Sequence, residues 1–157
     1  MSEPQRFTTT PEAGRRGRVV VPVPFDPDAV WGTKSLHHVH GTVDGHRIRA
    51  VIEQVDGRHW LVLGPAWQRD CGLAIGKAAD VELAPEGPQR GDLAPDLAAA
   101  LDANPQAGAF FDALAQFYRR GYLRWIDATT RKPELRAERI ALVVGWLAEG
   151  IKERPKP

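Results

Sequence analysis

The spacing of the apolar residues changes near the middle of the chain, and this change limits the possible folds more than any other feature. Up to about Leu83, apolar and polar residues tend to alternate, as in β-strands with one buried face. Beyond residue 92 the apolar residues recur with the helical period of about 3.6. The stretch APEGPQRGD, residues 84–92, is rich in proline, glycine and charge, which is typical of a linker. The sequence therefore predicts an α+β protein, with a β domain at residues 1–85 and a helical domain at residues 93–152.

The clearest β signal is Asp44-Gly45 within HHVHGTVDGHRIRAVIEQ, residues 37–54. A two-residue type I′ turn needs positive φ at both central positions, which Asp-Gly tolerates. This turn places Val43 opposite His46, Gly41 opposite Ile48 and Val39 opposite Ala50. One face of the hairpin is then apolar and the other polar, as a half-buried antiparallel pair requires. The apolar face carries Val39, Val43, Ile48, Ala50 and Ile52, and the polar face carries His38, His40, Thr42, Arg47 and Arg49.

Further short elements surround this hairpin. Helices of one or two turns are predicted to begin on Pro27 and Pro65, because proline suits the first helical position, and to end at Gly32 and Gly72. Closing a sheet of many short strands into a barrel removes its exposed edges. We therefore predict a small closed β-barrel with short helical caps. Its further strands are expected near Phe7 and at residues 18–23, 58–63 and 80–83, with a second turn at Asp56-Gly57.

The remainder of the chain predicts about four helices. A short helix carries Leu97 and Leu101 one turn apart, and Asn104-Pro105 is a capping residue followed by proline at the first helical position. Two longer helices are expected at residues 116–128 and 133–149, the last closed by Gly150. These elements predict a bundle of about four helices.

Composition excludes several classes of protein. The net charge is +1, from 21 basic and 20 acidic residues, and this balance argues against a dedicated nucleic-acid binder. The sequence has no secretory signal pattern and no run of 18 apolar residues. Cys71 is the only cysteine, so neither an internal disulfide nor a cysteine zinc cluster can form. We therefore expect a soluble cytoplasmic protein without membrane insertion.

Two sets of residues resemble a known bacterial family. VPFDPDAVWGTK and HGTVDG, residues 23–34 and 40–45, are similar to the N-terminal small-barrel domain of unknown function of YdeI/OmpD-associated proteins. LRWIDA, RKPELRAERI and LAEG, between residues 123 and 150, resemble the C-terminal helical domain of the same family, often labelled bacteriocin-protection. Where the family commonly has Ala-Lys and Thr-Arg pairs, this sequence has Thr129-Thr130 and Leu135-Arg136.

The resemblance implies a compact barrel with helical caps in front of a helical appendage. RDCGLAIGKAADVEL, residues 69–83, is also similar to the closing strand of AbrB-type swapped-hairpin barrels, which implies an AbrB-like, double-split type of barrel. The family label implies a link to protection against antimicrobial peptides or envelope stress.

Residues 118–140 mix arginines with aromatics and raise the question of a nucleic-acid surface. On a helix of residues 116–128, Tyr118, Tyr122, Trp125 and Ile126 form one stripe about 100° wide. Arg120 and Arg124 lie on the opposite side. Stacking on bases would need both groups on one exposed face, so we interpret the aromatics as core and the arginines as solvated.

Arg139 is the least expected residue of the last helix, because it lies within the apolar stripe. At about 100° per residue it falls between Trp146 and Val143, and Arg136 lies at the edge of the stripe. A guanidinium there needs an acceptor or must extend to solvent. One reading is an internal ion pair with Asp127, Asp112 or Glu134. Alternatives are recognition of a carboxylate or phosphate through the bidentate fork, or simple extension to solvent. Arg136 is expected to matter less for stability.

The histidines and remaining basic residues give weaker signals. His38 and His40 share a strand face, whereas His46 points to the other face, so we expect no metal site and no cofactor. Lys34, which follows WGT, can line the mouth of the barrel. With Arg47 and Arg49 of the polar hairpin face and Arg136 and Arg139, it completes the candidate ligand- or partner-binding residues.

No nucleophile–base pair or metal set can be assembled from the sequence, so we expect no enzyme. The favoured hypothesis is a non-enzymatic binding module for a protein, a peptide or a small acidic ligand, since barrel mouths and domain junctions favour such sites. The alternative is a nucleic-acid-associated regulator that uses an AbrB-like barrel, which rests on analogy of fold.

Overall fold

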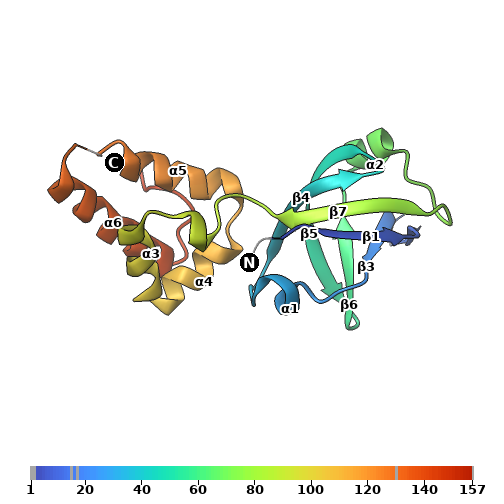
Figure 1. The fold of residues 1–157 in the computed structure, drawn as a ribbon, viewed down its shortest axis with the longest axis horizontal. Helices are drawn as coiled ribbons and strands as arrows, with labels where there is room; N and C mark the ends of the chain where they lie inside the picture. The colour runs from blue at the N-terminus through green and yellow to red at the C-terminus, as the bar shows by residue number, and fades with distance from the viewer. Residues whose placement is uncertain (1–2, 15, 17, 130, 157) are drawn as a thin grey trace. The chain divides into compact units, whose positions relative to one another are not determined.

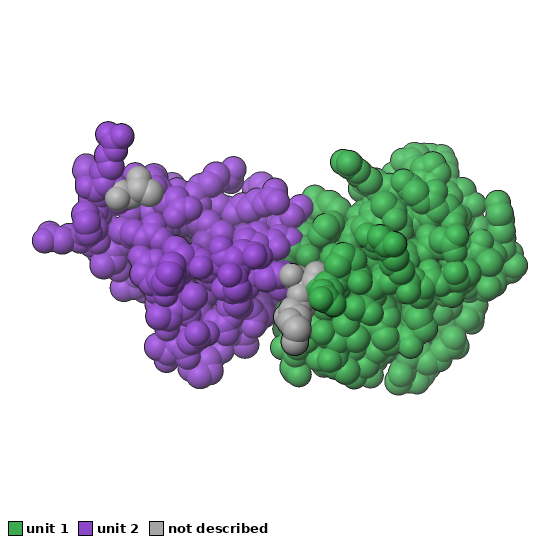
Figure 2. All heavy atoms as spheres, in the orientation of Figure 1, with its two compact units in different colours: residues 1–86 green, residues 87–157 purple. Residues whose placement is uncertain are grey.

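The computed structural model describes residues 3–14, 16, 18–129 and 131–156. The chain divides into two compact units, residues 1–86 and residues 87–157, shown in Figures 1 and 2. Among the described residues, unit 1 contains seven strands and two short α-helices, and unit 2 contains the longer helices, so the α+β class is confirmed. Within the described residues, no helix is both long and apolar enough to cross a membrane.

Unit 1 is built on one curled sheet of antiparallel strands in the order β1-β7-β4-β5-β6-β3-β2 (Figure 1). The order is largely that of a meander, in which β4, β5 and β6 pair with their neighbours in sequence. β7 then returns to pair with β4 on the other side. The strands are β1 (Gln5–Thr9), β2 (Glu12–Ala13), β3 (Val19–Val23), β4 (His37–Val43), β5 (His46–Val55), β6 (Arg58–Val62) and β7 (Ala79–Pro85).

The predicted hairpin register is confirmed. Asp44 and Gly45 have φ values of 48° and 83°, and Val43 pairs with His46. Val39, Val43 and Ile48 are buried in the core of unit 1, while His40 and Arg47 are exposed on the other face. The turn chemistry therefore decides which face of the hairpin meets the core. A shift of one residue would exchange the two faces.

The prediction of a closed barrel is wrong. β1 and β2 are the two ends of the sheet, and the described residues of β1 and β3 form no ladder, although Thr9 Oγ1 donates to the carbonyl of Pro22 at 2.8 Å. Two local features explain the opening. β2 pairs with β3 at Val19 and Val20, and Pro22 has no N–H to donate to a further strand.

Both short helices of unit 1 begin and end as predicted. α1 (Pro27–Trp31) is capped by the Asp26 carboxylate and ends at Gly32, and α2 (Pro65–Cys71) ends at Gly72 in the left-handed region. Trp31 is buried and packs edge-on against Phe25 at 5.2 Å between ring centroids. α1 thus contributes an aromatic anchor to the core of unit 1.

Unit 2 consists of helices that share one core. α6 packs against the other three helices. Asn104 Oδ1 accepts from the Ala107 N–H at the start of α4, and Gly150 has a φ of 75° after α6, so both predicted caps are confirmed. After the short 3-10 helix η2 (Arg90–Asp92), the helices are α3 (Pro95–Asp102), α4 (Pro105–Ala113), α5 (Gln116–Asp127) and α6 (Pro133–Ala148).

The segment predicted as a linker, residues 84–92, is held by contacts at both of its ends. β7 continues to Pro85, and Glu86 is buried, with its N–H bonded to the carbonyl of His38. The carbonyl of Pro88 accepts from Arg119 Nη1 at 2.8 Å. The connection between the two units is therefore only a few residues long, around Gly87.

Candidate functional site

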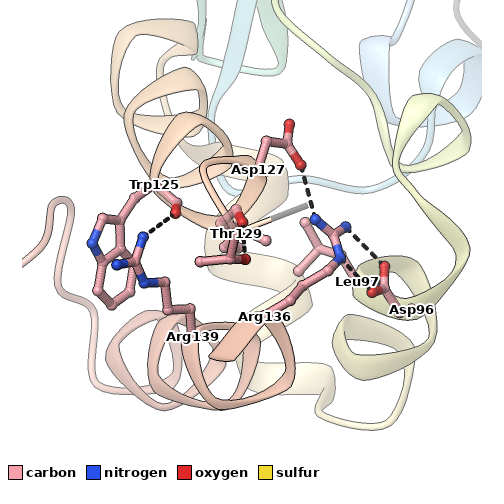
Figure 3. A network of polar contacts seen from close by, with 8 residues as sticks. Asp96, Leu97, Trp125, Asp127, Thr129, Arg136 and Arg139 are labelled. Atoms are coloured by element: carbon pink, nitrogen blue, oxygen red, sulfur yellow. Dashed lines mark hydrogen bonds and ion pairs between the residues drawn. The ribbon is translucent and has the colours of Figure 1, made fainter. Parts of the chain in front are cut away.

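Arg139 of α6 lies against Trp125 of α5 (Figure 3). Its Nη1 donates to the backbone carbonyl of Trp125 at 2.7 Å, and its Cζ is 4.5 Å from the centroid of the Trp125 ring. This carbonyl is available because the Thr129 N–H turns to the carbonyl of Ile126. A cation at the end of α5 is also favoured by the negative end of the helix dipole.

The predicted ion pair of Arg139 is wrong. Among the described residues, no carboxylate lies within ion-pair distance of its guanidinium. Asp127 pairs with Arg136 instead, Asp112 lies 3.2 Å from Arg90 Nε, and Glu134 is exposed at the start of α6. The physical reason is that the end of α5 offers a nearer acceptor together with an aromatic ring. Arg139 is half-buried and has one hydrogen bond to protein.

Arg136 has the carboxylate partners that Arg139 lacks (Figure 3). Its Nε lies 2.7 Å from Asp96 Oδ2 and its Nη2 3.1 Å from Asp96 Oδ1, a bidentate pair, and Nη1 lies 3.1 Å from Asp127 Oδ1. The Arg136 hydrogen bond lowers the pKa of Asp96, and both acids raise the pKa of Arg136. The residue joins α3, α5 and α6. These contacts favour a larger structural role for Arg136 than for Arg139, the reverse of the expectation from the helix projection.

The rings beside Arg139 form a compact group. Trp125 and Trp146 lie 5.5 Å apart between centroids, and Tyr122 stacks on Trp146 at 6.2 Å. Tyr122 and Ile126 are buried while Arg120 and Arg124 are exposed, so the reading of α5 as a core stripe with a solvated basic back is confirmed. Of these three rings, Trp125 is the one against which a guanidinium of α6, that of Arg139, packs.

Sequence reasoning missed Arg119, which is 2% exposed. Its Nε, Nη1 and Nη2 donate to the carbonyls of Leu114, Pro88 and Asp112 at 2.8, 2.8 and 2.7 Å. The signal was present, because a helix projection places Arg119 about 60° from Tyr122, inside the buried stripe. Arg119 anchors the first residues of unit 2 to the corner between α4 and α5.

The candidate residues of unit 1 occupy different surroundings. Arg49 holds the buried Glu86 in a bidentate pair, with Nε–Oε2 at 3.0 Å and Nη2–Oε1 at 2.9 Å, which raises the pKa of Arg49. Arg47 is exposed, and the Lys34 backbone N–H donates to Asp28 Oδ1. Arg47 and Arg49 therefore share one face of β5, but the fork of Arg49 is occupied by Glu86.

His37 is the second residue whose role the sequence did not disclose. It is 8% exposed, and its Nε2 lies 2.5 Å from Asp28 Oδ1. This hydrogen bond is the largest cause that lowers the pKa of Asp28. His40 and His46 are exposed, and no group of three metal-ligating side chains occurs in the described part of the chain. The absence of a metal remains a prediction for elemental analysis.

Comparison with known families gives a match in each unit. Residues 92–150 match the family described as Bacteriocin-protection, YdeI or OmpD-Associated, and residues 8–83 match the Domain of unknown function (DUF1905). The chain belongs to the YdeI/OmpD-associated family. The two matches cover most of unit 2 and nearly all of unit 1. A search of curated proteins gives no match.

In this YdeI/OmpD-associated protein, the matched region contains the whole Trp125–Arg139 arrangement. Thr129 is buried, and its hydroxyl donates to the carbonyl of Ile126. That contact closes the end of α5 beside the carbonyl that Arg139 binds. Thr130 lies outside the described residues.

Proposed function

We propose that this YdeI/OmpD-associated protein is a non-enzymatic binding module that recognises an acidic group on a protein, a peptide or a small molecule. The contact surface is the Trp125 face of unit 2, with Arg139 as the recognising side chain. The name of the family links its members to bacteriocin protection, and we extend that role to this chain as part of the proposal.

The observation that supports this proposal is the state of the Arg139 guanidinium. It is fixed by one backbone carbonyl and one ring, and no carboxylate of the described residues neutralises it. Because Nη1 makes the bond to Trp125, the Nε and Nη2 edge remains for a bidentate oxyanion. Arg136 offers no such edge, since its fork is occupied by Asp96.

The net charge of the surrounding sequence also favours an anionic partner. From residue 116 to the C-terminus the chain has ten Lys or Arg against five Asp or Glu. The chain as a whole is nearly neutral, so positive charge is concentrated in the part of unit 2 that carries the site. Such an excess attracts anionic partners and speeds their association.

Calorimetric titration with a polyglutamate peptide at low ionic strength tests the proposal. We expect saturable binding by the full chain, which Arg139→Met removes while the free energy of unfolding stays within about 1 kcal/mol. Arg120→Met is the matched control, because it removes the same charge from an exposed position of α5 on the side away from Trp125. Equal binding by the Arg139→Met protein would refute the proposed site.

A further inference from the structure

A second guanidinium lies against the same ring. Arg154, in the C-terminal segment, has its Cζ 5.1 Å from the centroid of Trp125, compared with 4.5 Å for Arg139. Neither arginine makes an ion pair with any residue that the structure describes. Two cations on one ring repel each other, and an aromatic face offsets only about 0.5–2 kcal/mol for each. Trp125 therefore carries two guanidiniums that no ion pair of the described residues neutralises.

The ring also forms one wall of a cavity. A space of about 290 Å³ lies between α5 and the C-terminal segment, lined by Gly121, Trp125, Glu153, Arg154, Pro155 and Lys156. Its volume is at the lower end of the range for small-molecule sites, which suits one small group. Arg154 and Lys156 of the lining are positive and Glu153 is negative. The lining alone has a net charge of +1, and Arg139, which lies against the same ring outside this lining, brings the charge around Trp125 to +2.

The segment that completes the cavity is anchored to α5 by other contacts. The Tyr122 hydroxyl donates to the carbonyl of Ile151 at 2.7 Å, and Lys152 Nζ lies 5.8 Å from the centroid of the Tyr118 ring. Arg154 lies two residues after Lys152. A wall that is already in place reduces the ordering cost that a ligand would otherwise have to overcome.

We propose that this cavity binds a group with two negative charges, a phosphate monoester or a dicarboxylate. The inference rests on the proposed function and adds a second arginine, a wall formed by the C-terminal segment, and a charge for the ligand. Arg154 and Lys156, which line the cavity, each offer donors to the dianion, and Arg139 on the same ring adds positive charge nearby. Charge-assisted bonds of this kind are the strong ones.

The test compares phenyl phosphate, phthalate and benzoate by calorimetry at pH 8 and constant ionic strength, where a phosphate monoester carries two charges. We expect the dianions to bind about tenfold or more tightly than benzoate. Arg154→Gln should weaken the dianions about tenfold and benzoate much less. Arg120→Gln, with the same loss of charge, should leave the affinities within about twofold. The dianion that binds more tightly shows whether the cavity prefers a phosphate monoester or a dicarboxylate.

Two results overturn the inference alone: benzoate binding as tightly as both dianions, or Arg154→Gln leaving dianion affinity unchanged. In either case the proposed function stands if Arg139→Met still removes polyglutamate binding. If the full chain binds neither polyglutamate nor any of the three small anions, the proposed function and this inference both fail. Arg154 is exposed in the C-terminal segment, so its replacement does not threaten folding.

Discussion

Arg136 and Arg139 lie three residues apart on one helix and differ in what surrounds them. The Arg136 side chain is 16% exposed and holds Asp96 and Asp127, whose side chains are 50% and 64% exposed. Arg139 has a carbonyl and a ring. Because the acids that hold Arg136 are half exposed, water can hydrate them when the arginine is removed. The expected loss is therefore smaller than for a fully buried pair.

Replacing each arginine by methionine separates these roles. Arg136→Met should lower the free energy of unfolding of unit 2 by about 1–2 kcal/mol, since three charge-assisted bonds disappear but the acids can be solvated. Arg139→Met should cost less, because methionine still covers the Trp125 ring. Urea denaturation of both variants measures the difference. A larger loss for Arg139→Met would mean that the ring and carbonyl contacts are the stronger support.

Tyr122 makes unit 2 sensitive to alkaline pH. Burial raises the pKa of Tyr122 from its ordinary 10.0 to about 12, so the folded state favours the neutral phenol. The resulting stability is fully present below pH 10 and is lost as the pH rises toward 12. We expect Tyr122→Phe to be less stable at neutral pH, by about 1 kcal/mol for the lost bond to Ile151, but flatter above pH 10. Denaturation between pH 8 and 12 checks both parts. If the stability of the wild-type and Tyr122→Phe proteins fell in parallel above pH 10, the raised pKa of Tyr122 would be contradicted.

Among the elements, those with local chemical signals were predictable from the sequence. Asp44-Gly45 specified the register of β4 and β5, and the prolines, glycines and Asn104 placed helix ends within about two residues. Closure of the sheet was not predictable, because it depends on whether β1 meets β3, and Pro22 lies at that meeting point. No local pattern reports such a distant pairing.

The candidate site was predictable only in part, for a similar reason. The helix projection found that Arg139 lies in an apolar stripe, but not its acceptor, which is a backbone carbonyl. Every residue has a backbone carbonyl, so the sequence does not show which carbonyl will be the acceptor. Acidic side chains, by contrast, can be read directly from the sequence. The predicted partners were therefore the acids Asp127, Asp112 and Glu134, and Asp127 pairs with Arg136 instead. Arg119 was missed although its place in the projection was visible.

Gly41 controls the contact between β4 and β7. A Cβ at this position would lie 1.8 Å from the carbonyl oxygen of Glu82, which is backbone and cannot turn away. We expect Gly41→Ala to destabilise unit 1 by about 3 kcal/mol or more, as severe overpacking does. Gly145→Ala is the control, because a Cβ there meets nothing within 4 Å and should stabilise α6 by about 0.5–1 kcal/mol. Thermal unfolding of the two variants should shift in opposite directions, and a tolerated Gly41→Ala would show that β7 can move.

At the scale of the whole molecule, the chain has two separate cores. Val39, Val43 and Leu61 belong to the core of unit 1, and Leu101 and Phe111 belong to that of unit 2. Each unit has its own hydrogen-bonded elements, so each should unfold as its own cooperative transition. The Arg49–Glu86 pair lies at the end of unit 1 and the Arg119–Pro88 bond at the start of unit 2, which places the change between them.

Calorimetry of two core variants of the full chain tests this division. Leu61→Ala and Leu101→Ala each remove a fully buried side chain, at a cost of about 2–5 kcal/mol. We expect each substitution to lower one of two thermal transitions and leave the other in place. A single transition that both substitutions lower would show that the units unfold as one. Limited proteolysis of the intact chain should then also spare residues 87–92.

The two kinds of arginine anchor in unit 2 respond differently to the solution. Arg136 is held by carboxylates, which accept protons in acid and are screened by salt. Arg119 is held by three carbonyl oxygens, which neither titrate nor carry a net charge. The crossing of α3, α5 and α6 is therefore a contact that acidification or concentrated salt can weaken, whereas the three carbonyl contacts of Arg119 at the corner of α4 and α5 do not titrate under the same conditions.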